Sequence, residues 1–396
     1  MRIIVQKFGG TSLKTEEGRK LAAHHVHHSV QNGYKVIAVV SAMGRKGDPY
    51  ATDTLLDLVD IRLIDKRERD LLMSCGEIIS AVKFKSVLCS LGLRAAAVTG
   101  AKAGIVTNDE FTNARIIRMN VEPLIEMLEM TDVVVVAGFQ GMTESGDVTT
   151  LGRGGSDTTA TAIGAAVKAE YVDIFTDVAG VMTADPAIVK DAKPLEKVTF
   201  SEICNMAYQG AKVIHPRAVE IAMQAKIPVR IRSTFSNDKG TLLTNERFQD
   251  RLVTSITHMP NITQIKVFAK EGQFDLQEKV FKAMANENIS VDFININPFG
   301  AVYTVMDEET DRAVNVLQKM GYEPEIKKHC AKISIVGAGM SGVPGVTAKI
   351  VEALAKENIP ILQSADSHTT IWVLVKNSDV VRAVNALHEA FRLNGS

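Results

Sequence analysis

The strongest constraint on the fold is a repeat in the C-terminal third of the chain. A shift of 70 positions places VFKAMANENISVDF over IVEALAKENIPILQ, and the RAVN at 312–315 over the RAVN at 382–385, with no gap. Each copy reads strand–loop–helix–strand–strand–helix, which is the split βαβ plan of a ferredoxin-like domain. Two copies predict pseudo-symmetric packing and a shared interface. A further strand, predicted at 252–258, could belong to either copy.

The N-terminal part has a different pattern, in which short β-branched runs alternate with helical segments up to about residue 235. The predicted strands are Ile3–Phe8, Lys35–Ser41, Ala95–Thr99, Val133–Phe139, Tyr171–Thr176 and Val229–Ser233. The predicted helices are Glu16–Asn32, Glu68–Leu91, Asn113–Met130, Thr158–Ala169 and Ala218–Ala225. Runs that are apolar on both faces, such as DVVVVAGF, indicate a mostly parallel α/β sheet flanked by helices.

These patterns predict four parts of the chain. Residues 1–235 form the first domain, the polar stretch 236–250 is a linker, and the two repeats occupy 251–328 and 329–396.

Composition limits which partners and which cellular compartment we expect for this chain. The chain has 396 residues with a net charge of -1, so no bulk field attracts nucleic acid or an anionic membrane. Its 4 cysteines include no CxxC pair, which is typical of thiols in a reducing compartment. The apolar run in MRIIVQKF is short for a signal peptide, and Val133–Phe139 is far shorter than the roughly 20 residues of a membrane helix. We therefore expect a soluble, cytoplasmic protein with no nucleic-acid or membrane partner.

Two motifs suggest sites that the rest of the sequence does not support. ISIVGAGMSG at 333–342 resembles a dinucleotide-binding turn, with Asp366 at the place of the ribose-binding acid, but only 54 residues follow it. The histidines of HHVHH (24–28) have helical spacing for a metal pair, but no carboxylate or cysteine cluster accompanies them. We expect a structural loop, a solvated helix face and no metal site.

The stretch LGRGGSDTTATAIGAAV (151–167) allows two interpretations. Ser156-Asp157 is a good N-cap for a helix of small residues at 158–167, and Gly-rich turns commonly open helices. The free N–H groups of such a helix start also favour an anion. This fragment alone does not decide between them.

Other polar motifs lie at the carboxyl ends of predicted strands, where open α/β sheets place their ligand sites. No Walker A sequence is present, but KFGGTS puts Lys7 at a strand end beside Gly9 and Gly10, whose bare N–H groups can approach phosphate closely. The motifs VVSAMG, SCGE, FTDVAGVMTADP and QGAKVIHP supply further polar groups.

Together with the repeats, these motifs in this order resemble the monofunctional bacterial aspartokinases over essentially the whole chain. That family joins an amino-acid kinase domain to two ACT domains. The resemblance implies transfer of the γ-phosphoryl group of ATP, with Mg²⁺ carried by the nucleotide, to the β-carboxylate of L-aspartate. The product would be 4-phospho-L-aspartate, the first intermediate toward diaminopimelate, lysine, threonine and methionine.

The resemblance also implies roles for individual residues. The catalytic group is Lys7, Asp157 and Lys212, with Asp157 between the two ammonium groups. The ATP-binding residues are Lys7, Gly9, Gly10, Thr176, Asp177, Met182, Asp185 and Lys212. The aspartate-binding residues are Ser41, Thr52, Glu77 and Arg153, with Arg153 on the α-carboxylate and Glu77 on the α-ammonium. The effector-binding residues are Gln273, Asp275, Ser290 and Asp292 in the first repeat.

Some features depart from the family pattern. Met182 stands where many relatives have tyrosine, and Ala187 stands where arginine is usual, which bears on nucleotide affinity. The first repeat lacks the Pro-Gly of the second, so the effector is left open among diaminopimelate, lysine and threonine. The chain looks most like the diaminopimelate-responsive class, and we expect a homodimer or higher homo-oligomer through the ACT repeats.

Two alternatives stay open at this stage. Other amino-acid kinases phosphorylate glutamate, carbamate or a nucleotide, but they generally lack the RGGSD–SCGE pairing and the twin repeats. A non-catalytic amino-acid sensor would need only the C-terminal half, and the combination of Lys7, Asp157 and Lys212 argues against it.

Overall fold

The computed structural model describes the 396 residues except 212, 246–250, 270–274, 341 and 396. The chain divides into two compact units. The first consists of Met1–Val181, Pro194–Tyr208 and Lys212–Arg247, and the second of Met182–Lys193, Gln209–Ala211 and Phe248–Ser396. Within the described residues, no helix has the length and apolar character needed to cross a membrane.

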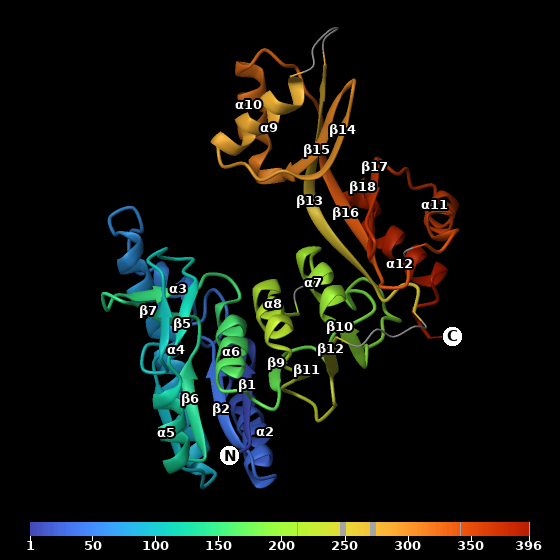
Figure 1. Ribbon diagram of the computed structural model, residues 1–396. Helices are drawn as coiled ribbons and strands as arrows, with labels where there is room; N and C mark the ends of the chain where they lie inside the picture. The colour runs from blue at the N-terminus through green and yellow to red at the C-terminus, as the bar shows by residue number, and fades with distance from the viewer. Residues whose placement is uncertain (212, 246–250, 270–274, 341, 396) are drawn as a thin grey trace. The chain divides into compact units, whose positions relative to one another are not determined.

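The first unit is built on an eight-stranded sheet that is mostly parallel, as its apolar strands predict (Figure 1). Its order is β10 (Lys197–Thr199), β12 (Thr241–Thr244), β11 (Val229–Ser233), β9 (Val172–Thr176), β1 (Ile3–Phe8), β2 (Lys35–Val40), β6 (Val133–Ala137) and β3 (Ala95–Val98). Among the described pairings of this sheet, that of β11 with β12 is antiparallel and the others are parallel. The carboxyl ends of β1, β2 and β9 therefore lie side by side at one edge of the sheet.

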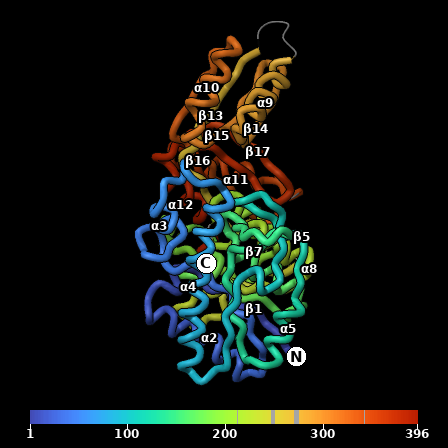
Figure 2. The backbone as a smooth tube through the Cα atoms, turned by 90° about the vertical axis from the view of Figure 1, so that its left-hand side faces the viewer, coloured from blue at the N-terminus to red at the C-terminus, as the bar shows by residue number. Residues whose placement is uncertain are grey.

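Helices cover both faces of this sheet. Their bounds are α1 (Gly10–Leu13), α2 (Glu16–Gln31), α3 (Thr52–Leu56), α4 (Lys66–Ser90), α5 (Glu122–Met130), α6 (Gly155–Ala166), α7 (Phe200–Tyr208) and α8 (Pro216–Ala225). Buried side chains of α2 and α4 pack with β1, β2 and β6 in one apolar core, which includes Phe8 and Phe84. On the other face, Gly164 of α6 packs against Val5 and Val172, and α8 packs on α6. Figure 2 shows α2 and α4 on one side of β1 and α8 on the other.

Two predictions for this unit were wrong in detail. The segment 113–130 is not one helix, because β5 (Ile116–Met119) precedes α5, whose start is marked by Pro123 in its first turn. With β4 (Ile105–Thr107), β7 (Gln140–Thr143) and β8 (Val148–Thr150), β5 forms a second, four-stranded sheet. The expected linker 236–250 contains β12, which pairs with β10 and β11.

The second unit contains both repeats in one antiparallel sheet of six strands (Figure 1). Its order is β14 (Asp292–Asn297), β15 (Gly300–Met306), β13 (Ser255–Phe268), β16 (Glu325–Val336), β18 (Thr370–Lys376) and β17 (Gln363–Asp366). The repeats also supply α9 (Leu276–Asn286), α10 (Thr310–Lys319), α11 (Val346–Lys356) and α12 (Val380–Ala390). Each repeat buries its own apolar core beneath its two helices.

The repeats are joined by two long strands. The second half of β13 pairs with β15 of the first repeat, whereas Ser255–Met259 of β13 pairs with the part of β16 that belongs to the second repeat. The predicted strand near 252–258 therefore continues into the first repeat. The expected boundary at 328/329 falls inside β16, a single strand that continues from one repeat into the other, with an irregular register opposite residues 259–264 of β13.

The loop of the ISIVGAGMSG motif has a structural explanation. A Cβ on Gly337 would lie 2.3 Å from the carbonyl oxygen of Leu252, and a Cβ on Gly339 would lie 2.6 Å from that of Arg251. Glycine is needed here because the chain entering β13 passes directly over the loop.

A segment from the middle of the chain packs into the second repeat. Ala184 and Val189 are buried in its core with Ile256 and Leu387. The Thr183 hydroxyl lies 2.9 Å from Nε2 of His388 on α12, and the Ile256 N–H donates to the Thr183 carbonyl oxygen at 2.9 Å. The segment Met182–Lys193 is therefore part of the second unit, although it precedes β10 of the first.

The packing predicts a large difference between two leucines on α4. Leu88 is 0% exposed and Leu71 is 57% exposed. Leu88→Ala should lower the free energy of unfolding by about 2–5 kcal/mol, because it leaves a cavity in the core. Leu71→Ala makes the same change in helix propensity at an exposed site and should cost no more than about 0.5 kcal/mol. Urea unfolding of both variants measures the difference, and equal effects would contradict this packing.

Candidate functional site

The best-defined polar site lies at the carboxyl end of β1. Nζ of Lys7 lies 2.7 Å from Oδ1 of Asp157, which belongs to the first turn of α6. Both side chains are largely buried, at 12% and 13% exposure. The other oxygen of Asp157 accepts from the His215 N–H at 3.3 Å, at the start of α8. Asp157 therefore connects a strand end and two helix starts.

A cavity of about 250 Å³ opens beside this pair. It is lined by Lys7, Gly9, Gly10, Thr11, Gly44, Arg45, Asp157, Phe175, Thr176, Asp177 and Val213. Six of the predicted catalytic and nucleotide-binding residues thus share one pocket. Gly10 is required by packing, since its Cβ would lie 2.5 Å from the Ala42 carbonyl oxygen. The bare turn gives a ligand access to backbone N–H groups, which suits phosphate.

Arg45 is a residue of this pocket that the sequence interpretation missed. Its guanidinium lies 3.1 Å from Oδ2 of Asp177, and its side chain is 74% exposed. The signal was present, because Arg45 directly follows the SAMG turn at the end of β2. Together with Lys7, it gives the pocket a second positive charge.

The start of α6 differs from the prediction of a Ser156-Asp157 cap. The helix begins at Gly155, and its N-cap is Gly154, in the left-handed region at φ 70°. A Cβ at Gly154 would lie 2.2 Å from the His215 ring, so no other residue fits. Ser156 and Asp157 therefore lie in the first turn, where the carboxylate of Asp157 turns toward Lys7 and complements the helix dipole.

Glu77 is a buried carboxyl group of the first unit. It is 2% exposed on α4, and its Oε1 accepts from the Ala42 N–H at 3.1 Å. Its Oε2 is buried without a hydrogen-bond partner. Burial raises the pKa of Glu77 from 4.5 to about 8. An orphaned carboxylate oxygen next to the end of β2 suits a cationic ligand group.

Close packing lets α4 approach the segments that follow β2. A Cβ on Gly76 would lie 2.7 Å from the Tyr50 carbonyl oxygen and 2.9 Å from the Ala42 side chain. The glycine of SCGE therefore lets the segments that follow β2 approach Glu77. Ser41, predicted to bind aspartate, directly follows β2, and its N–H donates to the Phe8 carbonyl oxygen at 3.1 Å. Thr52 begins α3.

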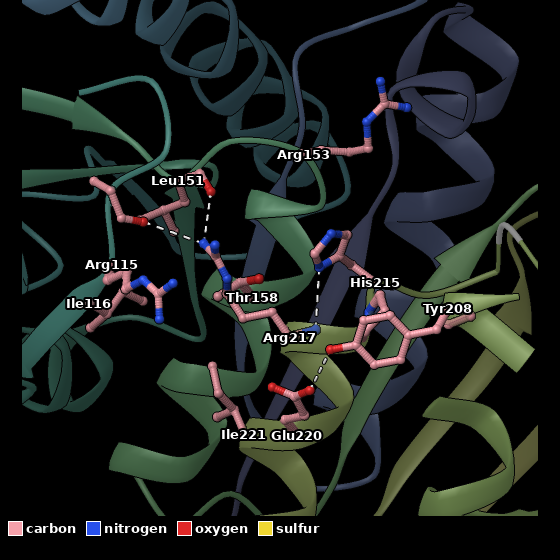
Figure 3. A pocket seen from close by; sticks show the side chains of 13 residues that line it. Arg115, Ile116, Leu151, Arg153, Thr158, Tyr208, His215, Arg217, Glu220 and Ile221 are labelled. Carbon is pink, nitrogen blue, oxygen red and sulfur yellow. Dashed lines mark hydrogen bonds between the residues drawn. The ribbon is translucent and has the colours of Figure 1, made fainter. Parts of the chain in front are cut away.

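Arg153 lines a different cavity, of about 720 Å³, between the starts of α6 and α8 (Figure 3). Its side chain is exposed and points away from Arg217 and Glu220 in that view. His215 and Arg217 belong to this cavity wall. Burial lowers the pKa of His215, and its Nδ1 accepts from the Arg217 N–H at 3.3 Å.

The remaining predicted kinase-site residues are placed as follows. Met182 and Asp185 belong to the second unit, where the Met182 carbonyl oxygen accepts from the Ser255 hydroxyl at 3.1 Å. Oδ1 of Asp185 accepts from the Ala187 N–H at 2.9 Å and shapes the loop locally. Lys212 lies outside the described residues.

The predicted effector residues lie in the first repeat. Asp292 begins β14, where its carboxylate accepts from the Phe293 N–H and forms an ion pair with Lys332, which is 3% exposed. Asp275 precedes α9 and pairs with Lys279 at 2.6 Å. Ser290 is exposed, and Gln273 lies outside the described residues. The carboxylate of Asp292 is thus already paired with a buried cation.

The part of the chain that the structure describes has no group of three His, Cys, Asp or Glu side chains arranged like metal ligands. Of the histidines in HHVHH, His25 packs on the Phe175 ring at 4.5 Å and contacts the Thr234 carbonyl oxygen at 3.1 Å. Burial lowers its pKa. The two contacts pack α2 on the sheet, so the expected solvated helix face is wrong for His25.

Comparison with known proteins gives consistent matches. Residues 2–233 match the model of the amino acid kinase family, and residues 325–389 match an ACT domain. The chain is 62% identical to Aspartokinase 1 of Bacillus subtilis over 100% of both chains, and 39% identical to the aspartokinase of Geobacillus stearothermophilus over 99% of this chain and 98% of that one. Among solved structures, E. coli aspartokinase III in complex with aspartate and ADP is similar at a TM-score of 0.80 and 25% identity, covering 98% of this chain and 99% of the other. The same enzyme with lysine and aspartate gives a TM-score of 0.77 at 26% identity, with the same coverage.

The raised pKa of Glu77 predicts a pH-dependent stability. Between 4.5 and about 8, folded Glu77 keeps a proton that the unfolded chain has released, so stability falls as the pH rises through this window. Glu77→Gln removes this titration. The variant should gain stability relative to the native chain by roughly 1.4 kcal/mol for each pH unit in the window. Thermal unfolding at a series of pH values measures the gain, and a constant difference would contradict the buried environment of Glu77.

Proposed function

The chain belongs to the aspartokinases of the amino acid kinase family, and from this premise we propose how its residues transfer the γ-phosphoryl group of ATP to the β-carboxylate of L-aspartate. The observation that carries the proposal is the Lys7–Asp157 pair at 2.7 Å beside the Gly9-Gly10 turn. Fixed positive charge and bare backbone N–H groups at a strand end suit a phosphoryl group in transit. The products are 4-phospho-L-aspartate and ADP.

The reaction needs positive charge more than it needs a base. A free aspartate side chain has a pKa of about 3.9, so the attacking carboxylate is already ionised at neutral pH. Its oxygen forms a bond to the γ-phosphorus while the bond to the β–γ bridging oxygen breaks, and ADP leaves. Lys7 offsets the charge on the transferring group, and Lys212 is proposed to do the same from its other side. Asp157 holds Lys7 in place.

Nucleotide binding is proposed to use the cavity between β1 and β9. Gly9, Gly10 and Lys7 face the phosphates, and Arg45 adds a cation at the same wall. Thr176, Asp177, Met182 and Asp185 are proposed as contacts to the adenosine. Mg²⁺ would neutralise the triphosphate and would be held mainly by the phosphates, which is common for this ion when few carboxylates are available.

Aspartate binding is proposed to use Ser41, Thr52, Glu77 and Arg153. The orphaned Oε2 of Glu77 is a suitable partner for the α-ammonium group, and that group would in turn favour the ionised form of Glu77. The guanidinium of Arg153 can donate two parallel hydrogen bonds to the α-carboxylate in a bidentate pair. The β-carboxylate would then face Lys7.

Regulation is proposed to act through the ACT repeats. E. coli aspartokinase III is known in complex with lysine and aspartate in a T-state, and in complex with aspartate and ADP in an R-state. For this chain we propose an end-product amino acid, with diaminopimelate preferred over lysine and threonine, bound near Gln273, Asp275, Ser290 and Asp292. We also propose that the repeats join copies of the chain into a homodimer or higher homo-oligomer.

A hydroxamate assay with aspartate and ATP tests the activity directly. Formation of aspartyl hydroxamate with aspartate, and its absence with glutamate, would support the proposal over the other amino-acid kinases. Binding of an amino acid without any ADP release would favour a non-catalytic sensor.

We expect Lys7→Ala to lower kcat by about 10²–10³ with a much smaller change in the KM for aspartate, because the lost charge acts mainly on the moving phosphoryl group. Steady-state kinetics with each substrate varied give both numbers. Lys14→Ala is a matched control, since Lys14 is 53% exposed and pairs with Asp48 outside the pocket lining. A Lys7 variant with near-native kcat would overturn the assignment.

Feedback inhibition should depend on Asp292. Asp292→Ala would leave the buried Lys332 without its partner. Two variants are therefore compared: Asp292→Asn alone, and Asp292→Asn combined with Lys332→Met. Together they separate effector binding from the cost of an unpaired buried charge. Both variants should keep the basal kcat and shift the inhibition curve to higher effector concentration. Curves with diaminopimelate, lysine and threonine, singly and combined, give the measurement. An unshifted curve in both variants would remove Asp292 from the effector site.

A further inference from the structure

Arg217, in the first turn of α8, binds the backbone next to Arg153. Its Nη1 donates to the Leu151 carbonyl oxygen at 3.0 Å and to that of Ala114 at 3.4 Å (Figure 3). Its Nη2 donates to Oδ1 of Asn113 at 3.2 Å. The guanidinium therefore joins two chain segments that are distant in sequence, one of which leads into Arg153.

Both neighbours of Arg153 are glycines held in the left-handed region. Gly152 has φ 72° and Gly154 has φ 70°. A Cβ on Gly152 would lie 2.9 Å from Oδ1 of Asn113, and one on Gly154 would lie 2.2 Å from the His215 ring. Glycine pairs leave a backbone free to adopt other conformations, so the position of Arg153 depends on what presses against them.

Arg217 contacts both of the groups that press on these glycines. Its Nη2 holds the side chain of Asn113, and its backbone N–H donates to Nδ1 of His215 at 3.3 Å. Of these two contacts, only the one to Asn113 comes from the Arg217 side chain, so that side chain supports the turn on the Gly152 flank, whereas the bond to His215 is a backbone cap of α8.

A second group completes the support from α4. The carboxylate of Asp70, which is 0% exposed, accepts from the Thr112 N–H at 2.9 Å and from the Thr150 N–H at 2.8 Å. The Thr150 hydroxyl also donates to it at 2.6 Å. Asp70 anchors the same two segments one residue away from the acceptors of Arg217. The turn is therefore fixed at both of its supports, and Arg217 is the support next to Arg153.

We propose that Arg217 is a positioning residue for aspartate recognition, which sets the orientation of Arg153 toward the substrate's α-carboxylate without touching the substrate itself. This inference rests on the proposed function, and specifically on the role of Arg153. Its guanidinium is occupied by the three acceptors named above, so its effect on substrate passes through the backbone of the turn.

The test is a double-mutant cycle between Arg217 and Arg153, read by steady-state kinetics. Arg217→Met should raise the KM for aspartate roughly ten-fold or more, with kcat and the KM for ATP within about threefold of the native values. Arg217→Lys should recover only part of the loss, because an ammonium cannot reach three acceptors in a fork. In an Arg153→Ala background, Arg217→Met should have no further effect on the KM for aspartate.

Arg115→Met provides the matched control. Arg115 lines the same cavity, is 71% exposed, and lies 4.0 Å from the carboxylate of Glu110. An unchanged KM in this variant would show that the loss in Arg217→Met does not come from the positive charge of the cavity wall. An equal rise in both variants would overturn the positioning role.

The outcomes separate this inference from the proposed function. No aspartyl hydroxamate from the native chain would end the proposed function itself. With a native chain that is active, equal changes in the KM for aspartate and for ATP, or full additivity with Arg153→Ala, would overturn the inference alone. Circular dichroism and the melting temperature of each variant identify a fold defect. If Arg217→Met does not fold, the partial variant Arg217→Lys carries the same cycle.

Discussion

The kinase unit is organised around the carboxylate of Asp157. One oxygen binds Lys7 at the end of β1, and the other accepts a hydrogen bond from the His215 N–H at the start of α8. The end of a central strand and two helix starts therefore depend on one side chain that is largely shielded from water. Because the local dielectric is low, this pairing holds the lysine more firmly than an exposed ion pair would.

The same unit uses glycines to bring polar groups together. Gly10 lets the turn after β2 approach the phosphate side of the pocket, and Gly76 lets that region approach Glu77. Gly154 admits the His215 ring at the start of α6. In each case a Cβ would overlap a backbone or ring atom, so the glycine-rich motifs reflect close packing as well as ligand access.

Much of the fold could be predicted from the sequence, because the residue pattern that marks a strand lies within the strand itself. The strands β2 and β6 are apolar on both faces, and that pattern needs no knowledge of the rest of the chain. The parallel sheet, the twin repeats, the kinase activity and the family were confirmed. The β5 strand was missed because IIRM is short and because its pairing partner β4 lies outside the segment 113–130 that was predicted as one helix.

The supports of the site could not be predicted in the same way. The bond from Thr150 to Asp70 spans 80 residues, and that from Arg217 to Leu151 spans 66. No local pattern records such partners. The Ser156-Asp157 cap failed for a related reason: cap preferences describe a helix end in isolation, whereas here His215 requires a glycine at the N-cap. The individual roles of the site residues stay predictions.

The continuation of β13 and β16 through both repeats has a consequence for how the regulatory unit changes during evolution. Each of these strands contributes one half to each repeat, so the two repeats exchange hydrogen bonds along both central strands. A recombination event that replaced a single repeat would have to join new halves onto both strands. The new halves would also have to match the register of the old ones, so that the hydrogen bonds between the strands could form again. Sequence divergence between the copies, residue by residue, is the easier route to two halves with different specificities. The repeats are therefore expected to have been inherited as a pair while their loops diverged.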